Sequence, residues 1–81
     1  MKVTVKLFAI AKQFAGNDEV ELELGESANV ESLRQELLSR LPELKPMQDS
    51  LRFAVNSEYA DDSTTIAQSD EVACIPPVSG G

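Results

Sequence analysis

The 81-residue sequence contains no histidine and only one cysteine, Cys74. Without histidine the chain cannot supply a Ser–His or Cys–His pair, and one thiol alone does not make a zinc site of the usual kind. A single cysteine cannot form an internal disulfide, so nothing here demands an oxidising compartment. Most nucleophilic and zinc-dependent chemistries are therefore excluded.

Glycine and long apolar runs are also scarce. The four glycines stand at positions 16, 25, 80 and 81, and they form no glycine-rich phosphate loop. No stretch approaches the roughly 18 apolar residues that span a bilayer. The chain opens with a strand pattern rather than an apolar signal sequence. We therefore expect a cytoplasmic protein with no membrane partner.

Basic residues are half as frequent as acidic ones, 7 against 14, which gives a net charge of -7. Such a surface repels phosphate backbones, so nucleic acid is not an expected partner, whereas a basic protein would be attracted. Solubility alone also explains the charge. A single domain of this length buries only about 60% of its unfolded surface, which leaves little room for a deep active-site cavity.

Two segments near the N-terminus alternate between apolar and polar residues, as half-buried strands do. In residues 2–8 the polar face carries lysines, and in residues 19–24 it carries glutamates. The short connection between the two segments favours antiparallel pairing. That pairing places the lysine face beside the glutamate face, where each pair of opposite charges contributes about 0.2–1 kcal/mol.

Helical spacing follows each of these strands. Ile10 and Phe14 are four residues apart, which predicts one or two helical turns after the first strand. Residues 30–41 carry an apolar stripe typical of an amphipathic helix, with Asn29 as its N-cap and Pro42 at its end. The charged residues expected on the solvent side of this main helix are Arg34, Glu36 and Arg40.

The second half of the chain predicts a loop with a 3₁₀ turn, then strands over residues 51–55, 58–60 and 71–75. Ile66 is expected to be a single apolar anchor between the last two. One helix must then cover one face of a mixed sheet of about five strands. A β-grasp arrangement of the α+β class fits, with the first and last strands central and parallel. Other small α+β folds also fit this order.

Isolated residues that could carry chemistry favour structural roles. The adjacent acids at 18–19, 61–62 and 70–71 are interpreted as solvated turn and cap residues. The chain has no histidine, and the tail has no lysine or arginine, to lower the pKa of Cys74. We therefore interpret Cys74 as a small buried side chain rather than a nucleophile or a docking point. The aromatic residues interpreted as core or partner contacts are Phe8, Phe14 and Phe53.

The C-terminal end of the chain is the best candidate for a functional site, because a structural role explains it less well than it explains the residues above. Pro76 and Pro77 stop the last strand and hold an extended path, and the chain finishes with two glycines. The six residues after Ile75 can reach about 20 Å at roughly 3.3 Å per residue, which suits insertion into a narrow slot of another protein. If the chain had only the Gly-Gly end, an ordinary frayed terminus would explain it. The combination of a strand, two prolines and two glycines is more specific. We divide the chain into a β-grasp domain over residues 1–75 and a flexible tail over residues 76–81.

With these features the chain resembles the small, sulfur-carrying subunit of molybdopterin synthase, the MoaD family of ubiquitin-like proteins. The resemblance covers the whole chain and is most specific in the terminal Pro-Pro-Val-Ser-Gly-Gly. Ser69 departs from the family, which often has glycine there, and a left-handed turn would strain it. Cys74 departs as well, because the family often has a bulky apolar residue. The matching segments are residues 7–9, 29–33, 53–56 and 70–81.

The resemblance implies that the C-terminal carboxylate is the working group. An ATP-dependent adenylyltransferase of the ubiquitin-activating type would adenylate it, and a persulfide donor would convert the adenylate into a thiocarboxylate. The tail would then enter the large subunit of molybdopterin synthase, whose residues catalyse sulfur transfer to the pyranopterin precursor of the dithiolene. The chain would be no enzyme by itself, hold no stable cofactor, and join a two-plus-two heterotetramer.

The site residues follow from the same resemblance. Gly81 would react, and partner contacts would come from Ile75 and Phe8, with no metal. Two alternatives stay open: a sulfur carrier for thiamine, cysteine or tRNA thiolation, and a ubiquitin-like binding module or tag whose tail is joined to lysines or inert. The residues expected to insert with the tail are Pro76, Pro77, Val78, Ser79 and Gly80.

Overall fold

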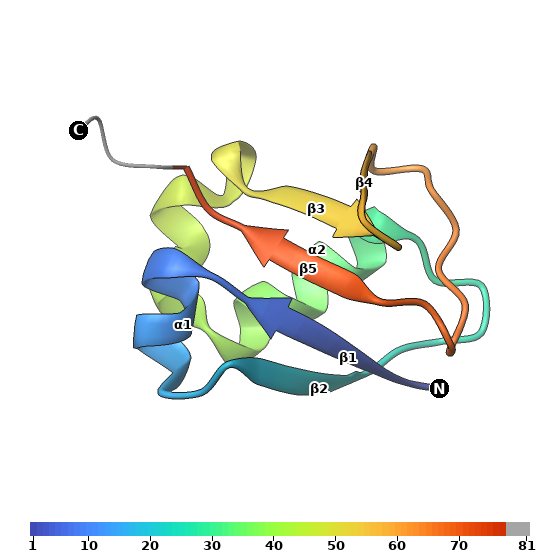
Figure 1. Ribbon diagram of the computed structural model, residues 1–81, viewed down its shortest axis with the longest axis horizontal. Helices are drawn as coiled ribbons and strands as arrows, with labels where there is room; N and C mark the ends of the chain where they lie inside the picture. The colour runs from blue at the N-terminus through green and yellow to red at the C-terminus, as the bar shows by residue number, and fades with distance from the viewer. Residues whose placement is uncertain (78–81) are drawn as a thin grey trace.

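The computed structural model describes residues 1–77, so the predicted tail residues 78–81 lie outside the described part of the chain. A five-stranded sheet in the order β2-β1-β5-β3-β4 carries its helices on one face (Figure 1). The elements are β1 (Lys2–Leu7), α1 (Ala9–Ala15), β2 (Glu19–Glu23), α2 (Val30–Arg40), the 3₁₀ segment η1 (Pro42–Ser50), β3 (Arg52–Val55), β4 (Glu58–Ala60) and β5 (Val72–Ile75).

The pairing of the strands confirms the predicted β-grasp arrangement. β1 pairs antiparallel with β2 and parallel with β5, and β5 pairs antiparallel with β3. The first and last strands are therefore central, as the pattern predicted. Lys2 lies opposite Glu23 and Lys6 opposite Glu19, so the lysine and glutamate faces are adjacent.

One apolar cluster fills the space between the sheet and the helices. The β1 positions predicted to face inward, Val3, Val5 and Leu7, are at most 2% exposed, and the anchor Ile66 is 1% exposed. The α2 stripe supplies Leu33, which is fully buried. Burying one such side chain contributes about 1.5–3 kcal/mol, so a small sheet and one main helix suffice to hold the fold.

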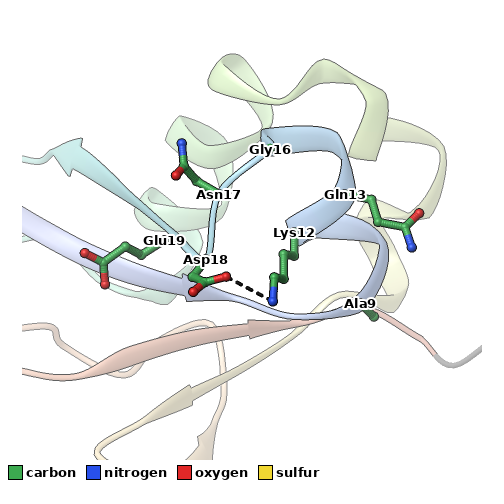
Figure 2. Close-up of a pocket in the computed structure, with 7 residues that line it drawn as sticks. All are labelled: Ala9, Lys12, Gln13, Gly16, Asn17, Asp18 and Glu19. Atoms are coloured by element: carbon green, nitrogen blue, oxygen red, sulfur yellow. Dashed lines mark ion pairs between the residues drawn. The ribbon is translucent and has the colours of Figure 1, made fainter.

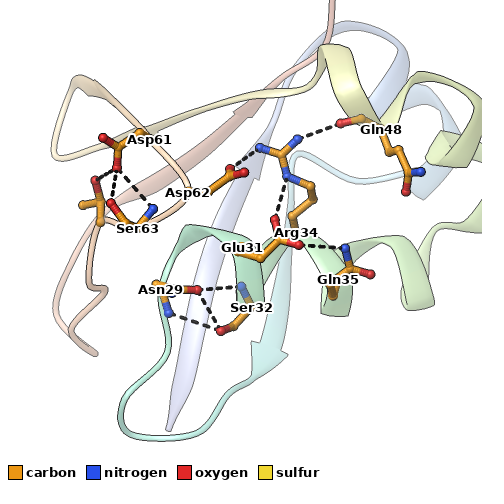
Figure 3. Close-up of polar contacts among 10 residues, drawn as sticks. Asn29, Glu31, Ser32, Arg34, Gln35, Gln48, Asp61, Asp62 and Ser63 are labelled. Carbon is orange, nitrogen blue, oxygen red and sulfur yellow. Dashed lines mark hydrogen bonds and ion pairs between the residues drawn. The ribbon is translucent and has the colours of Figure 1, made fainter.

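Local signals set the ends of the helices. Asn29 caps α2: its side chain accepts from the Ser32 backbone N–H at 2.9 Å, and the Ser32 hydroxyl accepts in return (Figure 3). Gly16 ends α1 in the left-handed region with φ 72°, as expected of a helix-ending glycine. The predicted N-cap of α2 is confirmed.

Within residues 1–77, the residues other than glycine that have positive φ are Ala9, Asn56 and Ser57. Asn56 and Ser57 both have positive φ, 52° and 71°, and connect β3 to β4 in a two-residue hairpin turn. Ser69 is not in the left-handed region, so the strain expected from its replacement of glycine is absent. Ala9 has φ 53°, a conformation that a residue with a Cβ seldom adopts and that the sequence did not predict.

Arg34 corrects the expectation that it lies on the solvent side of α2. Its side chain is only 14% exposed and spans three segments distant in sequence. The guanidinium donates to Asp62 at 2.6 Å and to the Gln48 carbonyl at 2.7 Å (Figure 3). It also lies over the Phe53 ring. Helical periodicity missed this role because η1 and the loop after β4 cover that side of α2.

We expect Arg34→Met to lower the free energy of unfolding by about 1–3 kcal/mol, because it removes two charge-assisted hydrogen bonds. The methionine side chain keeps an apolar contact with Phe53, so the loss reports the polar contacts. Urea denaturation followed by circular dichroism measures the change. Arg40→Met on the exposed side of α2 is the matched control, with an expected change within about 0.5 kcal/mol. Equal effects of the two substitutions would contradict the role given to Arg34.

Candidate functional site

The tail begins at the end of β5. β1 and β5 run parallel, so their carboxyl ends meet at the same end of the sheet, beside α1 (Figure 1). β5 lies between β1 and β3 and is bonded to both, which holds the root of the tail. Pro76 is buried and Pro77 is exposed, so the chain leaves the body of the domain between them.

Partly exposed apolar side chains lie around the start of the tail. They are on the bare face of the sheet, which is the face that the helices do not cover. The register that pairs Leu7 with Cys74 brings Phe8, 48% exposed, beside the half-buried Ile75. Ile75 also pairs with Arg52, whose guanidinium lies 4.2 Å from the centre of the Tyr59 ring. Apolar groups next to a cation on an aromatic ring are typical of protein-binding surfaces.

The sequence predicted only part of this surface. Phe8 and Ile75 were predicted as partner contacts, and their places near the tail root are compatible with that role, which stays a prediction. Arg52 and Tyr59 were missed. The alternation of β3 puts residue 52 on the bare face, and the hairpin places residue 59 opposite Ala54 on the same face. That alternation was the available signal.

Cys74 points away from this surface into the core. It is 0% exposed and pairs with Leu7 on one side and Phe53 on the other. Burial raises the pKa of the Cys74 thiol to about 12, opposed weakly by the charge of Arg34. A thiol that is neutral and covered is a poor nucleophile, and the prediction that Cys74 is a small buried side chain is confirmed.

A shallow hollow between α1 and the start of β2 contains no catalytic arrangement (Figure 2). Its lining is mostly polar and exposed, and the Lys12 ammonium forms an ion pair with Asp18 at 3.0 Å. The open shape excludes no water from a reacting group. The residues that line it are Ala9, Lys12, Gln13, Gly16, Asn17, Asp18 and Glu19.

The adjacent acids lie in turns or loops, as predicted, except Glu19, which is the first residue of β2. Two of them, Asp61 and Asp70, brace their loops. Asp61 accepts from the Ser63 and Thr64 side chains, and Asp70 accepts from the Ala67 N–H and Asn56. These hydrogen bonds hold the pKa of both carboxyls below the usual range. Within residues 1–77, no three potential ligand residues gather into a metal site.

The same described part of the chain has no helix long and apolar enough to cross a membrane. It presents a small sheet-and-helix body, a central last strand and an apolar surface at the place where that strand ends. These features define a ubiquitin-like β-grasp protein in which the central last strand, β5, is followed by Pro76 and Pro77.

The chain belongs to the ThiS family, whose sequence profile matches residues 5–81. It is 37% identical, over the full length of both chains, to a protein of Chlamydomonas reinhardtii named molybdopterin synthase sulfur carrier subunit. The match includes the C-terminal segment that the structure does not describe.

Solved structures agree with this assignment. A candidate molybdopterin converting factor subunit 1 from Pyrococcus furiosus is 36% identical and superposes with a TM-score of 0.85, covering 96% of this chain and 99% of that one. The protein named SAMP1 from Haloferax volcanii also gives a TM-score of 0.85, at 29% identity and full coverage of both chains.

Proposed function

We propose that this chain is the sulfur carrier of a molybdopterin synthase and that its reactive group is the C-terminal carboxylate of Gly81. The observation that carries the proposal is the full-length identity of 37% to a molybdopterin synthase sulfur carrier subunit. The tail that ends in Gly80 and Gly81 leaves the central strand beside an apolar surface, which supports the same proposal.

The carboxylate must be activated before it can carry sulfur, because it is a poor electrophile. In the proposed cycle its oxygen attacks the α-phosphate of ATP on an adenylyltransferase, and pyrophosphate leaves. The terminal sulfur of a persulfide donor then attacks the acyl carbon of Gly81 and displaces AMP. A thiol reduces the resulting acyl disulfide, which leaves a C-terminal thiocarboxylate. The chain holds no cofactor in this cycle, since ATP belongs to the activating enzyme.

The thiocarboxylate sulfur is a soft anion at neutral pH and attacks carbon. On the large subunit of molybdopterin synthase it would add to the pyranopterin precursor. Water would then hydrolyse the resulting thioester, which leaves the sulfur on the precursor and returns Gly81 to the carboxylate form, and two such deliveries would build the dithiolene. The catalytic residues of this step belong to the large subunit, because this chain has no histidine and its one thiol is buried. We propose that these steps take place in the cytoplasm.

The domain's own contribution is to present the tail and to compensate for ordering it. Fixing each tail residue costs about 1–2 kcal/mol of backbone entropy, which contacts with the partner must offset. Phe8 and Ile75, beside the tail root, are the residues we assign to those contacts. Glycine at positions 80 and 81 lets the chain pass where a Cβ would collide.

Reconstituted sulfur transfer tests the destination of the sulfur. The chain is prepared with a C-terminal thiocarboxylate and mixed with a molybdopterin synthase large subunit and the pyranopterin precursor. We expect dithiolene product and return of the carrier to the carboxylate form. A carrier that keeps its sulfur in this mixture but loses it in an assay for thiamine, cysteine or tRNA thiolation would move the proposal to that pathway.

A second candidate is a protein modifier, favoured by the likeness to SAMP1, which a related structure describes as a small archaeal modifier protein. In that role a lysine amine would displace AMP from the activated Gly81 and form an isopeptide bond. Mass spectrometry of the chain's covalent adducts separates the two. Isopeptide-linked Gly-Gly remnants on other proteins support the modifier, and a thiocarboxylate with no such remnants supports the carrier.

A further inference from the structure

The free edge of β2 is the feature of the fold that the carrier function leaves unused. Among residues 1–77, β2 is the outermost strand on its side of the sheet and pairs only with β1. It is five residues long with neither proline nor glycine, whereas β4 at the opposite edge has three residues. An edge strand of this kind can pair with another extended chain through its unpaired backbone groups.

The ends of the β1–β2 ladder determine which backbone groups point outward. Leu24 N–H donates to the Met1 carbonyl at 2.8 Å, and the Met1 amine donates to the Leu24 carbonyl at 2.6 Å. At the other end Leu7 N–H donates to the Asp18 carbonyl at 2.7 Å. Antiparallel ladders alternate inward-bonded and outward-pointing residues. The residues that turn N–H and C=O to the free edge are therefore Glu19, Glu21 and Glu23.

The same three residues carry exposed carboxylates on the bare face of the sheet. Glu23 lies 3.4 Å from the Met1 amine. Glu19 is opposite Lys6, but Glu21 is opposite Thr4, which has no charge. Neither Glu19 nor Glu21 forms an ion pair with any residue from 1 to 77. Glu21, in the middle of the edge, is the least neutralised of the three.

The negative charges of the three glutamates determine which kind of strand can pair with this edge. Residues directly opposite each other in an antiparallel pair lie on the same face, so an incoming strand places side chains beside the glutamates. A second copy pairing through its own β2 would set glutamate against glutamate, which is destabilising. Lysine or arginine at alternate positions would instead meet each carboxylate.

The core-facing side of β2 indicates which residues an incoming strand should carry between its basic residues. Leu22 is buried there, and Val20 is partly buried against the core. Arg40 at the end of α2 lines a shallow hollow beside Leu22 and Glu21. The intervening residues of an incoming strand are therefore expected to be apolar.

We propose that the free edge of β2 binds an extended segment of a partner protein in which lysine or arginine alternates with apolar residues, by adding an antiparallel strand to the sheet. β1 separates this edge from β5 and the tail, so the edge is distinct from the surface assigned to sulfur delivery. The proposal does not depend on which reaction the tail performs.

The test is a titration of the ¹⁵N-labelled full chain with the peptide acetyl-Lys-Val-Lys-Val-Lys-amide, followed by amide chemical shifts and amide hydrogen exchange. We expect the largest shifts and slowed exchange at Glu19, Glu21 and Glu23, whose N–H groups would become bonded. The control peptide acetyl-Glu-Val-Glu-Val-Glu-amide is expected to cause no such change.

Matched charge reversals separate edge pairing from general attraction to an acidic protein. Glu21→Lys is expected to weaken the peptide about tenfold, because one attractive cross-strand pair becomes repulsive. Glu43→Lys on η1 makes the same charge change away from the edge and is expected to leave affinity nearly unchanged. Glu21→Gln, a milder change, should fall between them. Equal weakening by Glu21→Lys and Glu43→Lys, shifts centred elsewhere, or no shifts at millimolar peptide would each overturn the proposal.

Discussion

Adding one alanine after Gly81 is expected to reduce sulfur transfer at least a hundredfold while leaving the domain folded. The extra residue moves the carboxylate by about 3.3 Å and puts a Cβ at the reacting end. Misplacement of a reacting group by about 1 Å can already cost 10²-fold in rate. The rate of thiocarboxylate formation with ATP, a sulfur donor and an activating enzyme measures the effect.

The control for this prediction is Gly25→Ala, which adds a Cβ at a glycine with open space around it. It is expected to transfer sulfur at the rate of the unaltered chain. Thermal unfolding followed by circular dichroism should give the same midpoint for the extended chain and the original. An extended chain that still carried and delivered sulfur would refute the role of the terminal carboxylate.

The thiol of Cys74 is expected to react about a thousandfold more slowly with a thiol reagent at pH 8 than it does in the unfolded chain. The reason is that burial raises its pKa from 9.0 to about 12, and each unit lowers the thiolate fraction about tenfold. Labelling followed by intact mass measures the rate, with urea-unfolded protein as the reference. Rapid labelling of folded protein would contradict the buried position of the thiol.

The same shift predicts a loss of stability in alkali. A raised pKa in the folded state means that the neutral buried thiol favours folding fully below pH 9, where the unfolded thiol is also neutral. As pH rises from 9.0 towards about 12, ionisation of the unfolded thiol removes this contribution, at up to about 1.4 kcal/mol per pH unit. Cys74→Ala removes the titrating group, so its stability should fall less steeply above pH 9; parallel curves would contradict the assignment.

Periodicity in the sequence was sufficient for the elements and their pairing. The alternation in β1 and β2, the leucine stripe of α2 and the cap at Asn29 are local signals, and each is confirmed. The order of the elements fitted a β-grasp arrangement with β1 and β5 central, but it also fitted other small α+β folds, and the strand pairing of the structure decides between them. Local patterns and the global fold agree in this chain, which is typical of sequences that specify one structure.

The features that the sequence did not predict depend on contacts between distant segments. Arg34 follows the helical pattern of an exposed residue, yet Gln48 and Asp62 come from elements that fold over it. The place of Arg52 against Tyr59 likewise depends on the β3–β4 hairpin. The identity of the reactive end came from resemblance rather than geometry, because residues 78–81 lie outside the described structure.

The most direct test of the account is the intact mass of the chain after incubation with ATP, a sulfur donor and a ubiquitin-activating-type adenylyltransferase. We expect a gain that corresponds to replacement of one oxygen by sulfur, mapped to Gly81 by fragmentation. That result would establish the carrier chemistry. An unmodified Gly81 with an adenylyltransferase that modifies another carrier under the same conditions would contradict the central claim and favour a ubiquitin-like binding module.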